Sequence, residues 1–338
     1  MNTKRLRQLI QAFFLILTAY GIYSYAMFVY YGKPRPDFMD GFCPISGVYD
    51  IIMQIRSGIT DPFHPAAMAI MVAAIITTFL FGKAFCSFFC PVGTFQDILT
   101  FLRNKTPFAK DLDKIGEKIK NHKLYFLLDY PLRTVKFLLL GWIIYIILQI
   151  PPQMMAMMNQ NINAAADIEL FKFWIELFKG DRPLIASIIF GIVAFSFIIP
   201  RFWCKYLCPL GAFYGIFNLF SLTHLRRCPA NCNNCNLCSK CIIGLKPHKS
   251  IEFNNTECTM CLECKEACNR NGIRLQILSR EIPFFVYPIL AVGVFMGVIF
   301  LFMEAGVWHS KLSMQNEAYL VLKQGFNVKW AKELLMQR

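Results

Sequence analysis

Five apolar segments, separated by polar stretches, dominate the pattern of this chain. They cover residues 9–31, 65–81, 132–150, 184–199 and 283–302. A helix that crosses a bilayer needs about 20 mostly apolar residues, so the pattern predicts five spans, of which the second and fourth borrow flanking aromatic residues. The first segment has no small-residue cleavage site, which favours an anchor over a signal peptide.

The composition supports a membrane location. Of the 338 residues, 56% are hydrophobic and 17% are charged, whereas soluble domains carry about 25% charged residues. The formal net charge is +14, but the basic residues lie between the apolar segments, where they set topology. This distribution disfavours nucleic-acid binding.

The lysines and arginines also predict an orientation. With a cytoplasmic N-terminus, the inner segments 1–8, 82–131 and 200–282 hold 22 basic residues and the outer segments hold 11. Cytoplasmic loops carry an excess of Lys and Arg, so we expect a multi-pass protein of the bacterial inner membrane. Its C-terminal tail is then periplasmic, and we expect it to anchor a partner because it has little to pack on alone.

A gapless shift of 118 residues superposes two parts of the chain. Pro65 falls on Pro183, Lys83 on Arg201, Cys86 on Cys204, Cys90 on Cys208, Pro91 on Pro209 and Gly93 on Gly211. The shift predicts a duplicated two-helix unit, each copy of which ends in C-x3-C-P. Because a copy contains an even number of spans, both copies have the same orientation, as in parallel repeats.

The repeat is expected to bring four thiols to one cytoplasmic face: Cys86, Cys90, Cys204 and Cys208. A spacing of four places each pair on one side of a helical turn, which the following proline ends or kinks. Two matching pairs favour a shared metal or redox site, such as a third iron–sulfur centre. The alternative is a pair of packed turns, since free cysteine is among the most buried residue types.

Nine of the fourteen cysteines lie in residues 228–268. The later run, with C-x2-C-x2-C-x3-C spacing, is Cys258, Cys261, Cys264 and Cys268; the earlier, slightly irregular run is Cys232, Cys235, Cys238 and Cys241. This spacing is typical of bacterial ferredoxins with two cubane clusters. Reduced thiols also indicate a cytosolic location for this domain.

In two-cluster ferredoxins the last cysteine of each run binds the cluster of the other run. Two [4Fe-4S] ligand sets follow, Cys232, Cys235, Cys238 and Cys268 for one cluster and Cys258, Cys261, Cys264 and Cys241 for the other. Cys228 is an extra thiol that could compete as a ligand. For the earlier run a zinc ribbon is the alternative, since zinc also accepts four thiolates.

An ionisable pair, Asp61 and His64, stands at the outer mouth of the second span. Such a pair could take a proton from a bound quinol as electrons leave. A capping or interfacial role is the alternative.

This constellation resembles the family of membrane-bound ferredoxin-type proteins typified by the NapH subunit of periplasmic nitrate reductase systems. The resemblance rests on the two C-x3-C-P motifs, the cysteine runs after the fourth span and a Cys43-Pro44 turn followed by Gly47. It covers roughly residues 1–280. It implies a quinol dehydrogenase component or an electron conduit to periplasmic reductases. The fifth span and the tail lie outside this pattern.

The expected fold is an α-helical membrane protein with about five spans built on a duplicated two-helix unit, plus a cytoplasmic α+β two-cluster ferredoxin insert. Its parts are the first repeat (1–98), a basic cytoplasmic linker (99–131), the second repeat (132–222), the ferredoxin domain (223–281), the fifth transmembrane helix (282–303) and the periplasmic tail (304–338).

The function expected from these features is that of an electron-transfer subunit in a membrane oxidoreductase complex. It would relay electrons between the quinone pool, or a membrane partner, and other redox subunits such as iron–sulfur or cytochrome proteins. The alternative is a metal-reducing maturation factor or redox-regulatory factor for another metalloenzyme.

Overall fold

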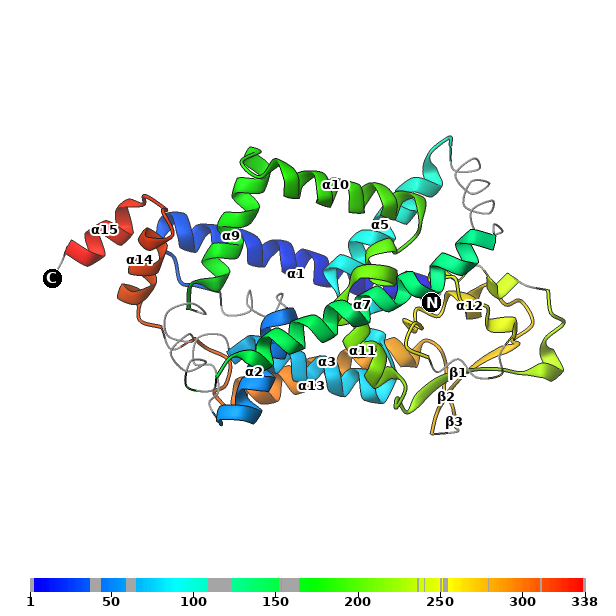
Figure 1. Cartoon of the computed structure of the whole chain (residues 1–338). Coiled ribbons are helices and arrows are strands. Elements are labelled where there is room, and N and C mark those ends of the chain that lie inside the picture. The colour runs from blue at the N-terminus through cyan, green and yellow to red at the C-terminus, as the bar shows by residue number, and fades with distance from the viewer. Residues whose placement is uncertain are drawn as a thin grey trace. The chain divides into compact units, whose positions relative to one another are not determined.

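The structure is a computed structural model (Figure 1). It describes residues 3–36, 44–58, 65–108, 123–151, 153, 164–235, 237–239, 241–249, 251, 255–278, 280–310 and 312–336, with the side chains of 44–45, 123–128, 164–166, 239 and 248 excepted. The chain forms two compact units. The first consists of residues 1–15, 74–143 and 189–295, and the second of residues 16–73, 144–188 and 296–338.

The described part is mostly helical. Its longer helices are α1 (Thr3–Tyr31), α2 (Pro44–Ser57), α3 (Pro65–Phe81), α5 (Pro91–Lys105), α7 (Lys123–Gln149), α9 (Ala164–Lys179), α10 (Pro183–Ile198), α11 (Pro209–Asn218), α13 (Val286–Glu304), α14 (Met314–Lys323) and α15 (Lys329–Met336). The shorter elements are α4 (Ala84–Phe88), the π-helix η3 (Trp203–Leu207), the 3-10 helices η4 (Pro229–Asn231), η5 (Leu237–Ser239) and η6 (Pro247–Lys249), α12 (Glu263–Glu266), and the strands β1 (Thr223–Arg227), β2 (Ile273–Ile277) and β3 (Arg280–Glu281).

A helix lies at each of the five predicted apolar segments. Within the described residues, α1, α7 and α13 are long and apolar enough to cross a membrane. The pair α9–α10 also meets this test if it counts as one span, although it is bent by 86° at its break, and α3 is a shorter apolar helix. The protein is therefore a membrane protein. Three or four helices of its described part are long and apolar enough to span a bilayer, and the count of five spans stays a prediction.

A small sheet in the first unit closes the cysteine-rich segment. Strand β1 pairs antiparallel with β2, so that Leu225 lies opposite Leu275, and β2 pairs with β3. Alternate side chains of a strand point to the same face. Both leucines are buried, so they lie on the inner face of the sheet. Since β1 precedes the first cysteine run and β2 follows the second, this pairing brings both ends of the segment together.

Aromatic rings pack the helical part of the first unit. Phe89, just before the second cysteine of the first C-x3-C-P motif, stacks on Phe295 of α13 with ring centroids 4.6 Å apart. Phe14 of α1 meets Phe89 edge-on at 5.0 Å. Such pairs stabilise a core by about 0.5–1.5 kcal/mol beyond the area they bury, so α1 and α13 fix the position of this turn.

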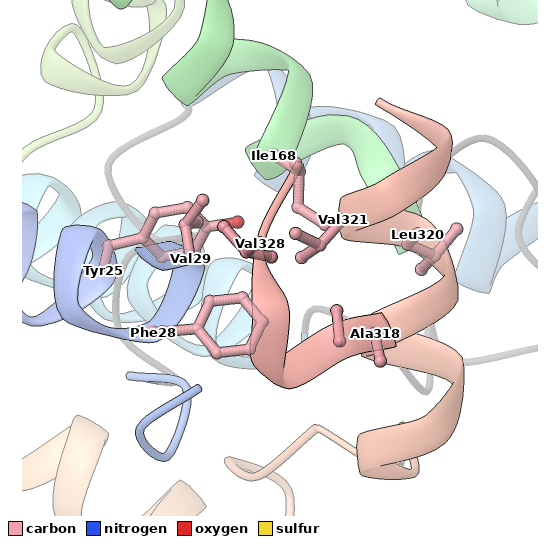
Figure 2. Packing of buried hydrophobic residues seen from close by; sticks show 9 residues of the cluster. Tyr25, Phe28, Val29, Ile168, Ala318, Leu320, Val321 and Val328 are labelled. Carbon is pink, nitrogen blue, oxygen red and sulfur yellow. The ribbon is translucent and has the colours of Figure 1, made fainter. Parts of the chain in front are cut away.

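The second unit has its own hydrophobic core (Figure 2). Residues of α1, α9, α14 and α15, with one residue between α14 and α15, form it: Tyr25, Phe28, Val29, Ile168, Ala318, Leu320, Val321, Val328 and Ala331. The indole Nε1 of Trp330 also donates to the carbonyl of Val29 at 3.1 Å. The expectation that the C-terminal tail has little to pack on is therefore wrong, because α14 and α15 bury apolar side chains against α1 and α9.

Candidate metal centre

A first cavity in the first unit is lined by four of the predicted ligands, and we call it the Cys258 cavity. Its walls are Cys241, Cys258, Cys261 and Cys264 together with Leu225, Ile243, Leu245, Pro247, Thr259 and Leu262. Three of these thiols come from the later run, whereas Cys241 is the last cysteine of the earlier run. The four thiols therefore share one mostly apolar pocket.

A second cavity, which we call the Cys232 cavity, is lined by the other predicted set. Its thiols are Cys232, Cys235, Cys238 and Cys268, and Arg227, Asn231, Asn233, Asn234, Leu237, Pro247, Asn269, Arg270, Gly272 and Ile273 complete the lining. Cys268 comes from the later run, so the two runs exchange their last cysteines. Cys228, the extra thiol, is absent from the lining of both of these described cavities.

The backbone turns around both cavities in the same way. Asn234 and Met260, each placed just before the second cysteine of its run, have left-handed φ values of 55° and 53°. Non-glycine residues adopt this conformation rarely, and it persists where surrounding structure enforces it. The matching conformation indicates that the two C-x2-C loops are built alike, despite the irregular spacing of the earlier run.

The donor set fits a polynuclear cluster better than a single ion. Among the described residues, no three Cys, His, Asp or Glu side chains converge closely enough to hold one metal ion. A zinc site needs four thiolates about 2.3 Å from the ion. A cubane cluster spreads its cysteines around a larger body, and two cavities with four thiols each match that requirement.

Burial opposes ionisation of two thiols of the Cys258 cavity, Cys258 and Cys264. It raises the pKa of Cys258 to about 12, and burial together with the charges of neighbouring cysteines raises the pKa of Cys264 well above its usual value. A buried thiolate needs a compensating positive charge, which iron would supply.

The two C-x3-C-P motifs form similar turns. In each, the first cysteine lies in a short helix, α4 for Cys86 and the π-helix η3 for Cys204, and the second cysteine caps the next helix. Pro91 and the corresponding Pro209 are the first residues of those helices, a position that suits a residue without an N–H. The helical turn that holds the first cysteine ends before each proline, as predicted, and the proline begins the next helix.

One capping thiol accepts a hydrogen bond from its helix N-terminus. The backbone N–H of Gly211 donates to Sγ of Cys208 at 3.2 Å. In the first copy Cys90 makes no such side-chain hydrogen bond, and burial together with the neighbouring Cys86 raises its pKa to about 12. Such N–H groups stabilise negative charge on sulfur.

The structure brings the four C-x3-C-P thiols together in the first unit. Burial raises the pKa of Cys204 well above its usual value, and the charges of Cys208, Cys90 and Cys86 add to the increase. All four sulfurs therefore lie within electrostatic reach of one another. They do not converge on a single ion, as stated above for the described residues.

A charged junction connects these turns to the Cys258 loop. Arg201 forms two hydrogen bonds with the Asp97 carboxylate, at 2.8 and 2.7 Å, and its Nη1 donates to Oγ1 of Thr259 at 3.1 Å. The hydroxyl of Ser87 donates to the carbonyl of Thr259 at 2.6 Å. Ser87 follows Cys86 and Thr259 follows Cys258, so one hydrogen bond joins the residues next to both cysteines.

Other buried cations hold the same loop. Lys83 donates to the carbonyl of Thr256 at 3.0 Å, and Lys136 pairs with Glu257 at 2.6 Å. Arg7 donates to the carbonyl of Cys261 at 3.2 Å. The matching positions of Lys83 and Arg201 in the repeat were a sequence signal for this role. No sequence signal identified the residues that these cations contact.

Asp97 stays ionised within this junction. Burial opposes its ionisation, but the charge and hydrogen bonds of Arg201 outweigh it and hold the pKa of Asp97 below its usual value. The pKa of Arg201 is raised in turn despite its own burial, mainly by Asp97. The junction therefore contains a fixed ion pair.

The predicted quinol pair, Asp61 and His64, lies outside the described residues, as does the central part of the basic linker, residues 109–122.

Comparisons with known proteins identify the family of this chain. The sequence matches the family described as 4Fe-4S binding domain over residues 63–108 and 182–227, which contain the two C-x3-C-P motifs. YccM of Escherichia coli K12, named as an electron transport protein, is 32% identical over 317 residues, which cover 88% of this chain and 85% of YccM.

More distant relatives share smaller parts. The methylamine utilization ferredoxin-type protein MauN of Paracoccus denitrificans is 27% identical over 50% of this chain and 55% of its own length. The regulatory protein NosR of Stutzerimonas stutzeri is 28% identical over 61% of this chain, but the match covers only 26% of NosR. No solved structure matches the chain. The extended match to YccM and the two matches to the 4Fe-4S binding domain show that the chain belongs to the NapH-type family of membrane-bound ferredoxin-type proteins.

Proposed function

We propose that this protein is a membrane electron-transfer subunit that holds two [4Fe-4S] clusters between β1 and β2. The observation that carries the proposal is the exchange of cysteines between two cavities, each lined by three thiols of one run and the last thiol of the other. Two-cluster ferredoxins bind their clusters in this crossed manner. The relatives named as electron transport and ferredoxin-type proteins support the same function.

The residues around the cavities have the properties that such clusters need. A bound [4Fe-4S] cluster supplies one-electron chemistry at a potential set by charge, hydrogen bonds to sulfur and solvent exposure. The chain contributes four thiolates per cavity and an N–H donor on at least one sulfur, since Gly272 donates to Sγ of Cys268 at 3.2 Å. The apolar residues Leu225 and Leu262 line the Cys258 cavity and limit access of water to it.

We extend the proposal to the four C-x3-C-P thiols, Cys86, Cys90, Cys204 and Cys208, as ligands of a third iron–sulfur centre. Their support is the electrostatic proximity of the thiols, the N–H group that donates to Cys208 and the family match over both motifs. The basic residues of the junction would offset the negative charge of thiolates there.

The position of the protein in the membrane belongs to the same proposal. The excess of basic residues in the inner segments supports a cytoplasmic ferredoxin domain and a periplasmic C-terminal tail. Electrons would be exchanged with the quinone pool near Asp61 and His64 and with other redox subunits.

A second candidate function is redox regulation or maturation of another metalloenzyme. The observation that favours it is the similarity to the regulatory protein NosR. Purification of the native complex separates the two candidates. A reductase subunit bound in the complex supports electron transfer, whereas loss of metal from a separate enzyme on deletion supports maturation.

Anaerobic analysis of iron and acid-labile sulfide tests the electron-transfer proposal. Two cubane clusters give about eight iron and eight sulfide per chain, and a third centre would raise both numbers. Cys261→Ser and Cys235→Ser should each lose one cluster, whereas Cys228→Ser, the matched control, should lose none. One zinc per chain without labile sulfide would contradict the proposal.

A further inference from the structure

Arg201 occupies an unusual place for a charged residue. Its side chain is fully buried, with 0% of it exposed, and its backbone has a left-handed φ of 55°. Glycine suits that conformation better than any residue with a Cβ. The backbone conformation and the buried charge of Arg201 are both unfavourable on their own. The contacts of the guanidinium must therefore offset these two costs.

Those contacts hold the guanidinium beside the Cys258 cavity. One side of the guanidinium is held by the Asp97 carboxylate through two hydrogen bonds, at 2.8 and 2.7 Å. The other side donates to Oγ1 of Thr259 at 3.1 Å, one residue from Cys258 in the loop around the Cys258 cavity. In sequence, Arg201 stands three residues before Cys204 of the second C-x3-C-P turn. A single side chain thus bridges the loop and the turn.

The charge of Arg201 lies next to the Cys258 cavity. Its guanidinium donates to Thr259, which lines that cavity beside Cys258. Charges at buried sites are screened much less by salt than exposed charges are. Reduction of a cluster held by four thiolates adds one electron and one negative charge, and no bond forms or breaks. A nearby fixed cation stabilises the reduced form.

We propose that the buried positive charge of Arg201, which Asp97 holds in place, raises the reduction potential of one cluster. This is the cluster bound by Cys258, Cys261, Cys264 and Cys241. This inference rests on the proposed function, because it requires a cluster in that cavity. It assigns the ion pair a role beyond holding the fold together: Arg201 raises the potential and Asp97 lowers it.

Redox titration of the purified full-length protein, followed by EPR, tests the assignment. Arg201→Gln should make the reduction equilibrium of one cluster at least tenfold less favourable. For a one-electron couple this lowers the midpoint potential by about 59 mV or more. Arg201→Lys keeps the charge and should shift the midpoint less. Asp97→Asn removes the opposing charge and should shift the same midpoint upward.

Arg280→Gln is the matched control, since it removes one positive charge from the exposed strand β3 and should leave the midpoint unchanged. An unchanged midpoint in Arg201→Gln with full iron content would overturn the assignment. If Arg201→Gln fails to assemble the cluster, the test rests on Asp97→Asn. An unchanged or lower midpoint potential in Asp97→Asn would then contradict the proposal. A wild-type protein without iron and labile sulfide would instead contradict the proposed function.

Discussion

Gly93 and Gly211 occupy equivalent positions in the two C-x3-C-P repeats, but their surroundings differ. A Cβ at Gly93 would lie 2.5 Å from the carbonyl oxygen of Cys86, whereas a Cβ at Gly211 would meet nothing closer than 3.5 Å. The first distance forces the backbone of the turn to move, and the second is ordinary contact. The requirement for glycine is therefore strict in the first copy only.

This difference predicts opposite effects for one substitution. Gly93→Ala should lower the free energy of unfolding, because overpacking typically costs about 1–3 kcal/mol and exceeds the gain in helix propensity of about 1 kcal/mol. Gly211→Ala, its matched control, should be neutral or stabilising. Thermal unfolding of the detergent-solubilised variants measures both effects, and equal melting temperatures would argue against the tight contact at Gly93.

At the scale of elements, the two turns reach the same arrangement through different helices. The first cysteine lies in an α-helical turn in one copy and in a π-helix in the other. In both copies the second cysteine then caps a helix that begins with proline. Thus the sequence pattern specifies the cap and the proline, while the preceding turn tolerates variation.

The C-terminal helices give a second prediction at this scale. The ring of Trp330 in α15 covers Gly32, where an added Cβ would lie 2.6 Å from it, and its Nε1 donates to Val29. Trp330→Ala removes this packing and should cost less than the roughly 3–5 kcal/mol of a fully buried Trp, because Trp330 is half-buried. Limited proteolysis should then cleave α14 and α15 faster than in the wild type.

Trp174→Ala in α9 is the control for that experiment, since Trp174 is 44% exposed and should leave cleavage unchanged. If Trp330→Ala resists the protease as well as the wild type does, α15 is not held by this contact.

At the scale of the whole molecule, the sequence predicted what local spacing encodes. The apolar segments coincide with helices, and the two predicted cysteine sets line separate cavities. Cluster binding by these sets stays a prediction. The partners of buried charges were not predicted. Asp97 in α5 and Arg201 after α10 are 104 residues apart. No periodic sequence pattern relates two charged residues at such a separation.

The tail shows the same limit. Apolar residues of α14 and α15 alternate with polar ones, so their sequence suggested an exposed end. Their partners on α1 and α9 lie far away along the chain, and only the folded structure brings them together.

The central claim is that two clusters are bound in a crossed manner, and EPR of the reduced cysteine variants tests it most directly. Cys241→Ser should alter the signal of the same cluster as Cys258→Ser, because both thiols line one cavity. Cys268→Ser should alter the signal of the cluster that Cys235→Ser affects. The account would be contradicted if Cys241→Ser and Cys235→Ser affected one cluster while Cys268→Ser and Cys258→Ser affected the other.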